Sequence, residues 1–303
     1  LDDVVRAIRT VRPDVVVTRF AADAQTHGHH VASARLAAEA FVAAADPTYV
    51  TDGLAPWAAN RLLHNQSTWS LPDGADTSHL MRVDVGTFDP RTGRWVGELA
   101  AASRTMHKSQ GMGSEADKGP VAELFAPLAG PALRPTDDPF GGLDFTWARF
   151  PGTRPLVRAL QAAADRFDAR APHEVLPQLA RAHAALEAVP DPHWRTIATA
   201  ELEQVLLDAA AVWIEARADR PAVAPGGAVK VAVDLGIGSP ADVIVRGVAL
   251  GPAGVAPTIG AAGFPSGLTV DGPVHLEVEH PVPADSPLTQ PPWLVEPPGS
   301  ARY

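Results

Sequence analysis

Residues 12–20, RPDVVVTRF, decide the fold because they place a run of β-branched residues between two predicted helices. The run at 14–18 has the continuous apolar character expected of a strand that is buried on both faces. Helical spacing of apolar residues predicts an amphipathic helix over 1–12, which Pro13 ends, and an alanine-rich helix over about 30–45. Helix, buried strand, loop and helix in this order are typical of a parallel α/β sheet.

The rest of the chain continues this α/β segment and then changes character twice. We expect a Rossmann-like parallel sheet, incomplete at its N-terminus, over residues 1–150, in which 97–110 form a helix. Residues 151–220 carry a helical pattern, so Trp213 is expected in the core of a helical domain. Residues 221–303 are rich in Pro, Gly and Val, and their alternating segments predict a β-sandwich-like domain that is truncated.

Composition excludes several classes of protein and site. The chain has 25 Lys and Arg against 35 Asp and Glu and no basic patch, so nucleic-acid binding finds no support. It contains no cysteine, so any metal would be held by His, Asp or Glu. No apolar run is long enough for a membrane span. The chain opens at Leu1 inside a helical pattern, and we interpret it as a piece of a longer protein whose compartment and oligomeric state cannot be inferred.

Three histidines, His27, His29 and His30, stand at the predicted start of the second helix, in the loop where ligands of parallel sheets gather. Helical spacing places His30 on the same face as Ala34 and Phe41, toward the sheet. The positive end of the helix favours neutral imidazole, the form that binds zinc. Helix capping or a polar surface is the commoner role of a His-x-x-His pair, and a catalytic zinc needs three protein ligands. The residues alone leave both interpretations open.

Four segments resemble the LmbE-like, PIG-L family of zinc-dependent N-acetyl-sugar deacetylases. RPDVVVTRF with THGHHVASARLAAEAF resembles the block in which a buried strand leads to a His-x-x-His at a helix start. AAASRTMHKSQGMG (100–113) resembles a later helix with a His-x-Ser-Gln ending. FGGLDFTW (140–147) and LTQPPWL (288–294) are similar to segments of long bacterial multidomain members. These members append helical and β domains to the deacetylase domain.

The resemblance implies that His30 ligates zinc and that His27 polarises the substrate carbonyl or stabilises the oxyanion. It also implies a further His and Asp ligand and a general base from an Ala-His-Pro-Asp-Asp block, which is absent from these 303 residues. We therefore expect this chain to bind Zn²⁺ weakly and to be inactive. The intact parent is expected to hydrolyse the N-acetyl group of an amino sugar or a related N-acyl compound. Many relatives place Asp at the position of His29, which puts the orientation of His27 in doubt.

Four other residues are candidates for contact with a small-molecule or glycan substrate. Arg19 follows the buried strand and would meet an anionic or hydroxyl-rich substrate, or else pair with Asp23. His107 and Gln110 share a predicted helical face, and Ser109 enters a glycine-rich loop that could close over a sugar. Capping of the helix C-terminus would explain His107 equally well.

Two rival functions remain. One is a non-catalytic carbohydrate-binding or scaffolding protein, in which the α/β part holds no metal and the β domain binds glycans. The other is a hydrolase that uses the histidines without metal. The second needs a nucleophilic serine beside histidine, and the sequence has no Gly-x-Ser-x-Gly elbow.

Overall fold

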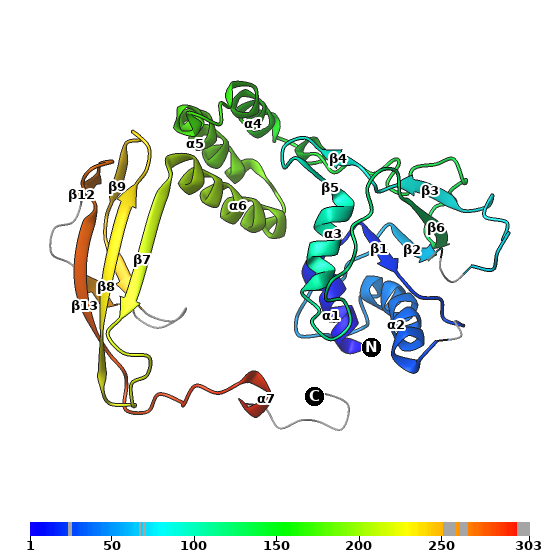
Figure 1. Cartoon of the computed structure of the whole chain (residues 1–303), viewed down its shortest axis with the longest axis horizontal. Coiled ribbons are helices and arrows are strands. Elements are labelled where there is room, and N and C mark those ends of the chain that lie inside the picture. Colours follow the sequence, from blue (N-terminus) through cyan, green and yellow to red (C-terminus); the bar gives the residue numbers. More distant parts are fainter. Residues whose placement is uncertain (24–25, 67, 69–70, 251–257, 261–265, 296–303) are drawn as a thin grey trace. The chain divides into compact units, whose positions relative to one another are not determined.

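The structure is a computed structural model that describes residues 1–23, 26–66, 68, 71–250, 258–260 and 266–295. The chain divides into two compact units, Leu1–Leu143 and Asp144–Tyr303 (Figure 1). It is a mixed α/β protein that contains a sheet with one parallel strand pair and further antiparallel sheets. No helix in the described part of the chain has both the length and the apolar character that crossing a membrane requires.

The first unit contains the predicted helix, strand and helix. The helices are α1 (Asp2–Val11) and α2 (Gly28–Ala45). The main sheet has the order β1-β2-β6-β3, with β1 (Val15–Thr18), β2 (Arg61–Gln66), β6 (Ala122–Ala129) and β3 (Met81–Asp84). β1 and β2 pair in parallel, joined by α2, whereas β6 runs antiparallel to both of its neighbours. The predicted parallel pairing is therefore confirmed for β1 and β2, whereas β6 and β3 pair antiparallel in the same sheet.

Strand β6 was not predicted, and Pro127 is the physical reason. Proline has no N–H to donate and is found within sheets at edges and bulges. Here Pro127 lies opposite Leu63, at the point where the pairing of β2 with β6 shifts register beside Leu62. The shift in register accommodates the proline, which lacks an N–H donor. The strand β6 can therefore continue through Pro127.

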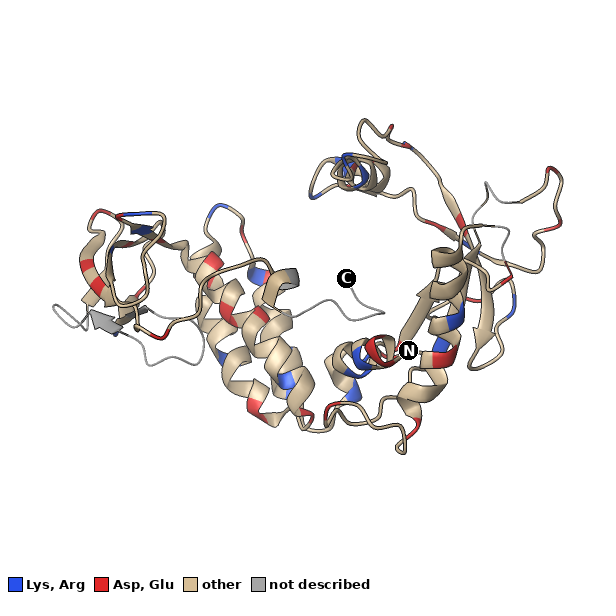
Figure 2. Cartoon of the chain, turned by 90° about the horizontal axis from the view of Figure 1, so that it is seen from below, with Lys and Arg blue, Asp and Glu red and all other residues tan. Residues whose placement is uncertain are grey.

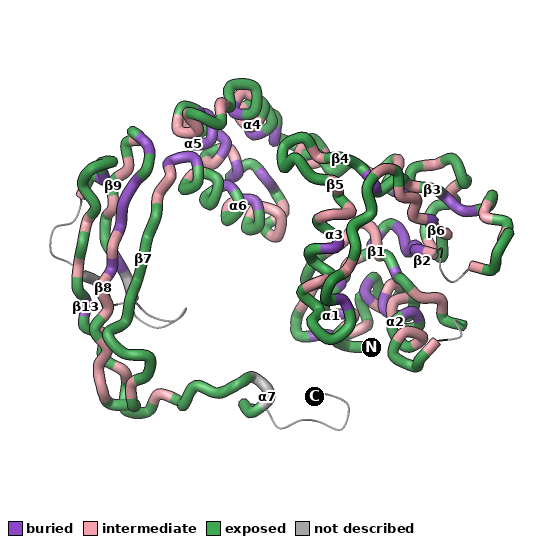
Figure 3. Tube along the Cα trace, viewed as in Figure 1, coloured by how far each residue is buried: buried purple, intermediate pink, exposed green. Residues whose placement is uncertain are grey.

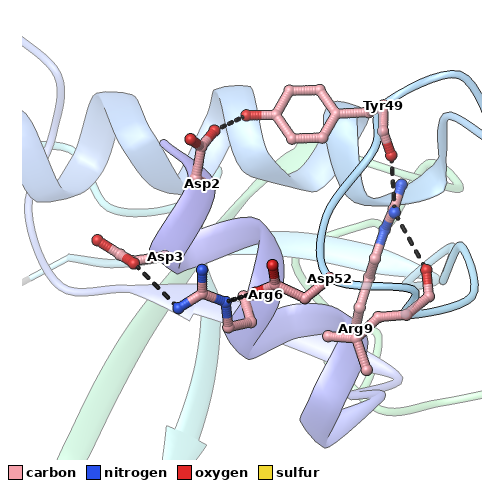
Figure 4. Close-up of polar contacts among 7 residues, drawn as sticks. Asp2, Asp3, Arg6, Arg9, Tyr49 and Asp52 are labelled. Atoms are coloured by element: carbon pink, nitrogen blue, oxygen red, sulfur yellow. Dashed lines mark hydrogen bonds and ion pairs between the residues drawn. The ribbon is translucent and has the colours of Figure 1, made fainter.

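The packing of α1 on α2 depends on apolar contacts and on one buried arginine. Val5, Ile8, Ala40 and Ala44 form the buried cluster between the two helices. Arg9 is 3% exposed and donates hydrogen bonds to five backbone carbonyls at and beyond the end of α2. These acceptors belong to Ala43, Ala44, Asp46, Tyr49 and Leu54. Figure 4 shows the bond to the Tyr49 carbonyl. The guanidinium thus adds a donor to carbonyls at and beyond the helix end, although those of Ala43, Ala44 and Asp46 also accept a backbone N–H.

The predicted helix at 97–110 is shorter than expected. After the short hairpin of β4 (Phe88–Asp89) and β5 (Arg94–Trp95), α3 covers Val96–Thr105. The chain then folds back, and a side chain at Gly111 would lie 2.2 Å from the Arg104 carbonyl oxygen. Only glycine permits this close approach, and the reversal ends the helix before residue 107.

The helices of the second unit pack around a core of their own. They are η2 (Trp147–Arg149), α4 (Arg154–Arg166), η3 (Pro172–Val175), α5 (Leu176–Ala185), η4 (Leu186–Ala188) and α6 (Pro192–Ala210). Leu156, Leu179, Leu186 and Val189 are among the buried residues that they share. The predicted helical segment is confirmed up to Ala210.

The predicted helix at residues 212–217 is wrong, because these residues belong to a strand. Ala211 adopts a left-handed conformation with φ 53° and ends α6, and β7 (Val212–Ala218) follows directly. The β-branched and aromatic residues that begin β7 favour a strand. Trp213, expected in the core, is 41% exposed.

The strands of the second unit form small antiparallel sheets. The largest has the order β13-β8-β7, with β8 (Ala228–Ile237) and β13 (Val274–Pro281). The others pair β9 (Val243–Val245) with β12 (Ser266–Leu268), and β10 (Val248–Leu250) with β11 (Thr258–Gly260). A short helix, α7 (Pro292–Val295), follows.

One face of the β13-β8-β7 sheet carries the core. Val233, Leu235 and Ile237 of β8 are buried in a cluster with Val248 and Leu268. Figure 3 shows the contrast between β8, with its buried stretch, and β7, which is exposed along most of its length. On the opposite face, Trp213, Glu215 and His275 are exposed to solvent, as is common for one face of an antiparallel sheet.

Candidate functional site

The three histidines follow the carboxyl end of β1, where the chain leaves the sheet for α2. β1 is a short β-branched strand, and β2 places His64 beside Thr18 in parallel register. In parallel sheets, ligand-binding loops gather at this edge. His27 is the residue before the first turn of α2, so His30 lies in that first turn. The position expected for this cluster is confirmed.

His30 is held by an aromatic stack and a hydrogen bond. Its ring lies flat on Phe20, with centroids 3.6 Å apart and planes 8° from parallel. Its Nδ1 shares a hydrogen bond of 3.0 Å with the Thr26 hydroxyl. The His27 ring lies 3.7 Å from the His30 ring on a tilted plane, and His29 makes an edge contact with His27. His30 is half-buried, whereas His27 and His29 are exposed.

These contacts favour a neutral imidazole at position 30. Desolvation by the surrounding protein lowers the pKa of His30, and the nearby His27 and His29 lower it further. When Nδ1–H donates to Thr26, the lone pair of Nε2 is available to bind a metal ion. The sequence analysis identified the loop between β1 and α2 as a candidate site, but it did not identify Phe20 or Thr26 within that loop.

Arg19 pairs with residues of β2 and β6, and no ion pair joins it to Asp23 among the described residues. Its Nη1 lies 3.0 Å from the Glu123 carboxylate and also donates to the Asn65 side chain. Asn65 in turn donates to Glu123 at 2.7 Å. The expected pairing with Asp23 is therefore wrong. β6 was not predicted as a strand, so Glu123 could not be identified as a partner.

His64 is a buried titratable residue that sequence reasoning missed. It is 8% exposed at the carboxyl end of β2, and burial lowers its pKa, while a hydrogen bond with the Arg19 backbone raises it. The signal was the sequence RLLHNQ, in which polar residues close an otherwise buried strand. Polar residues at that end of a parallel strand face the ligand edge of the sheet.

The second set of candidates lies beyond the end of α3. His107, Ser109 and Gln110 occupy an exposed turn, so His107 and Gln110 do not share a helical face. The backbone amides of Gln110 and Gly111 both donate to the His107 carbonyl. Within the described ranges, no hydrogen bond or ring contact joins these residues to His27, His30 or Arg19.

The described residues do not complete a catalytic zinc site. No group of three or more His, Asp or Glu residues that could hold a metal ion occurs in this part of the chain. The chemistry of the site suits a single ligand, because His30 offers one ring nitrogen while the other is bound to Thr26. A complete site would need two further protein ligands.

No family model, curated protein or solved structure matches this chain.

Proposed function

We propose that this chain forms part of a zinc-dependent amide hydrolase that removes the N-acetyl group from an amino sugar or a related N-acyl compound. The proposal follows from the resemblance to the LmbE-like, PIG-L deacetylases. The observation that carries it is the arrangement of His30, stacked on Phe20 and bonded through Nδ1 to Thr26 at the ligand edge of a parallel strand pair. A metal-binding histidine commonly has its second ring nitrogen fixed in this way.

The proposal assigns distinct tasks to the two imidazoles. His30 would ligate zinc through Nε2, and zinc would supply Lewis-acid chemistry toward the amide. His27, exposed and 3.7 Å from the His30 ring, would donate a hydrogen bond to the oxygen on which negative charge develops. Arg19, fixed by Glu123, is available to hold a substrate hydroxyl.

The proposal also requires strands in addition to those of the β1-β2-β6-β3 sheet. A Rossmann-like sheet would need further parallel strands beside β1, which is the edge of its sheet in the described part of the chain. Val17 of β1 is 48% exposed, as expected where another element could pack. We propose that such a segment carries the Ala-His-Pro-Asp-Asp block with the remaining ligands. The β strands of the second unit would form the sandwich-like domain.

The gene provides the first test. The DNA upstream of the Leu1 codon is expected to encode the Ala-His-Pro-Asp-Asp block in frame. A translation start at Leu1 itself would contradict the hydrolase and leave a carbohydrate-binding or scaffolding protein as the alternative.

Metal content provides the second test. In the longer protein that carries the block, His30→Ala should abolish stoichiometric zinc in elemental analysis. His29→Ala is the matched control, because that exposed neighbour contacts neither Phe20 nor Thr26, and it should retain one zinc per chain. Retention of zinc by the His30 variant would refute the ligand assignment.

Kinetics provide the third test. His27→Ala should keep the metal and lower kcat for an N-acetyl-sugar substrate by about 100-fold, as expected for loss of one oxyanion contact. An unchanged kcat would remove His27 from the chemistry.

A further inference from the structure

We propose that the open face of the β13-β8-β7 sheet binds a neutral pyranose sugar, stacked on the indole of Trp213. The binding surface, called here the Trp213 face, consists of Trp213, Glu215, Arg217, Asp234 and His275. All five belong to the second unit, so the proposal is independent of the hydrolysis proposed for the first unit.

Trp213 presents a flat apolar surface to solvent. It pairs with Gly236 across β7 and β8. A Cβ atom at Gly236 would lie 2.3 Å from the Cε2 and Cζ2 atoms of the indole, so the ring lies directly on the glycine backbone. Gly236 is buried beneath it, whereas Trp213 is 41% exposed. One face of the ring covers the sheet and the other remains accessible.

A row of polar side chains lies next to this ring. Glu215, Asp234 and His275 are directly opposite one another on the three strands. Glu215 is two residues from Trp213 along β7, and residues so spaced lie on the same side of a strand, about 7 Å apart. A ligand seated on the indole would therefore reach this row. Aromatic side chains beside polar groups are well suited to recognise amphipathic ligands.

The polar row is held in place by its own contacts. One Asp234 oxygen lies 2.5 Å from Nδ1 of His275, and the other lies 2.5 Å from Nη2 of Arg217. These partners, His275 first, lower the pKa of Asp234, so the carboxylate is ionised at neutral pH. The side chains of Glu215, Arg217 and His275 are each more than half exposed. Their remaining donors and acceptors can face a ligand.

This arrangement favours a neutral polyhydroxy ligand over an anionic one. Arg217 offsets the charge of Asp234, and the exposed groups include both donors and acceptors. Sugar hydroxyls need both kinds of partner, and the C–H face of a pyranose ring can stack on an indole. Glu277 and Glu279 of β13 point to the same side by strand alternation, as does Lys230 opposite Glu279. Acidic groups therefore outnumber basic ones on this face, which disfavours an anionic ligand.

A purely structural role explains only half of this geometry. Aromatic residues often cover strand glycines, and that role needs only the inner ring face of Trp213. It does not account for the exposed outer face or for the Asp234 network beside it. Binding measurements separate the two roles.

Isothermal titration calorimetry of the full chain with cellohexaose and with the hexamer of N-acetylglucosamine tests the proposal. The unmodified chain should bind at least one of them saturably. Trp213→Ala should weaken binding by about tenfold, the usual effect of losing one aromatic stacking contact. Ile214→Ala is the matched control, because this neighbour is 61% exposed on the other face of β7, and it should bind as the unmodified chain does.

A second variant keeps the test informative if Trp213→Ala does not fold, as judged by circular dichroism. The double variant Glu215→Ala, His275→Ala changes only exposed side chains and should weaken binding several-fold. The proposal is overturned if neither sugar binds, if folded Trp213→Ala binds as tightly as the unmodified chain, or if the double variant is unaffected. Saturable binding of tetramethylammonium in place of sugar would also overturn it, in favour of a cation site.

Discussion

The two units place their reactive side chains in different parts of a sheet. In the first unit, His27, His30 and Arg19 lie in segments that leave the carboxyl end of a parallel strand pair. In the second unit, Asp234 and His275 lie on the open face of an antiparallel sheet. Parallel pairing brings successive strand ends to one edge, whereas antiparallel pairing leaves one face available. The same residue types therefore form a loop cluster in one unit and a flat surface in the other.

The units also differ in how they hold charge. Arg9 of the first unit is buried and bound by backbone carbonyls, while Asp234 of the second is bound by exposed side chains. Figure 2 shows acidic and basic positions interspersed on the described elements. Backbone partners are fixed by the fold, whereas exposed side-chain partners move and are screened by salt. Three predictions test the packing and the charged groups of the two units.

The largest effect is expected for Arg9→Ala. The substitution removes five hydrogen bonds to backbone carbonyls and opens a void between α1 and α2, so the free energy of unfolding should fall by about 3 kcal/mol or more. Urea denaturation measures it. Arg91→Ala is the control, because that side chain is 89% exposed and, among the described residues, bonds only to Asp89. Its effect should be below about 0.5 kcal/mol. Equal effects would contradict a structural role for Arg9.

A smaller effect is expected for Gly236→Ala in the second unit. The new methyl group would overlap the Trp213 ring, so the free energy of unfolding should fall by about 1–3 kcal/mol. Trp213→Ala in the same chain should relieve most of this loss, as a double-mutant cycle would show. Gly267→Ala is the control, since no described atom beyond its two chain neighbours lies within 4 Å of its Cβ position. Additive effects of the two substitutions would mean that the indole does not cover Gly236.

The smallest effect concerns two carboxylates with lowered pKa values. Asp84 accepts hydrogen bonds from the backbone amides of Gly86 and Val121, and Asp234 is bound by His275 and Arg217. Each stabilises the fold above the unfolded pKa of about 3.9, and this contribution is lost as pH falls through the lower folded-state pKa. About 1 M salt should raise the pKa of Asp234 and leave that of Asp84 nearly unchanged. Carboxyl ¹³C titrations at two salt concentrations measure this, and equal shifts would contradict it.

Local periodicity in the sequence predicted most of the helices and strands. The strands that it missed depend on contacts between residues distant in sequence. α1, β1, α2 and β8 were evident because each carries an uninterrupted pattern. β6 was missed because Pro127 argues against a strand unless the partner's register shifts. β7 was assigned to a helix because its first residues continue an apolar run, and the left-handed Ala211 that separates them from α6 has no sequence signature.

The candidate site was predictable in position but not in detail. The histidine spacing placed His27 and His30 at a helix start, where the structure has them. The partners of Arg19 and the burial of His64 depend on strands distant in sequence, so local patterns could not reveal them. The turn at 107–110 depends on the close approach of Gly111 to Arg104, which is also a tertiary effect.

The junction at Ala211 has a mechanical consequence. A single residue separates α6 from β7, and both sides are pinned: Ser239 donates to the Ala210 carbonyl at 2.7 Å and Gly238 to the Ala211 carbonyl at 2.8 Å. Because one residue and two hydrogen bonds fix this junction, we expect α6 and β7 to move together. A ligand that shifts the strand carrying Trp213 is then expected to shift α6 with it.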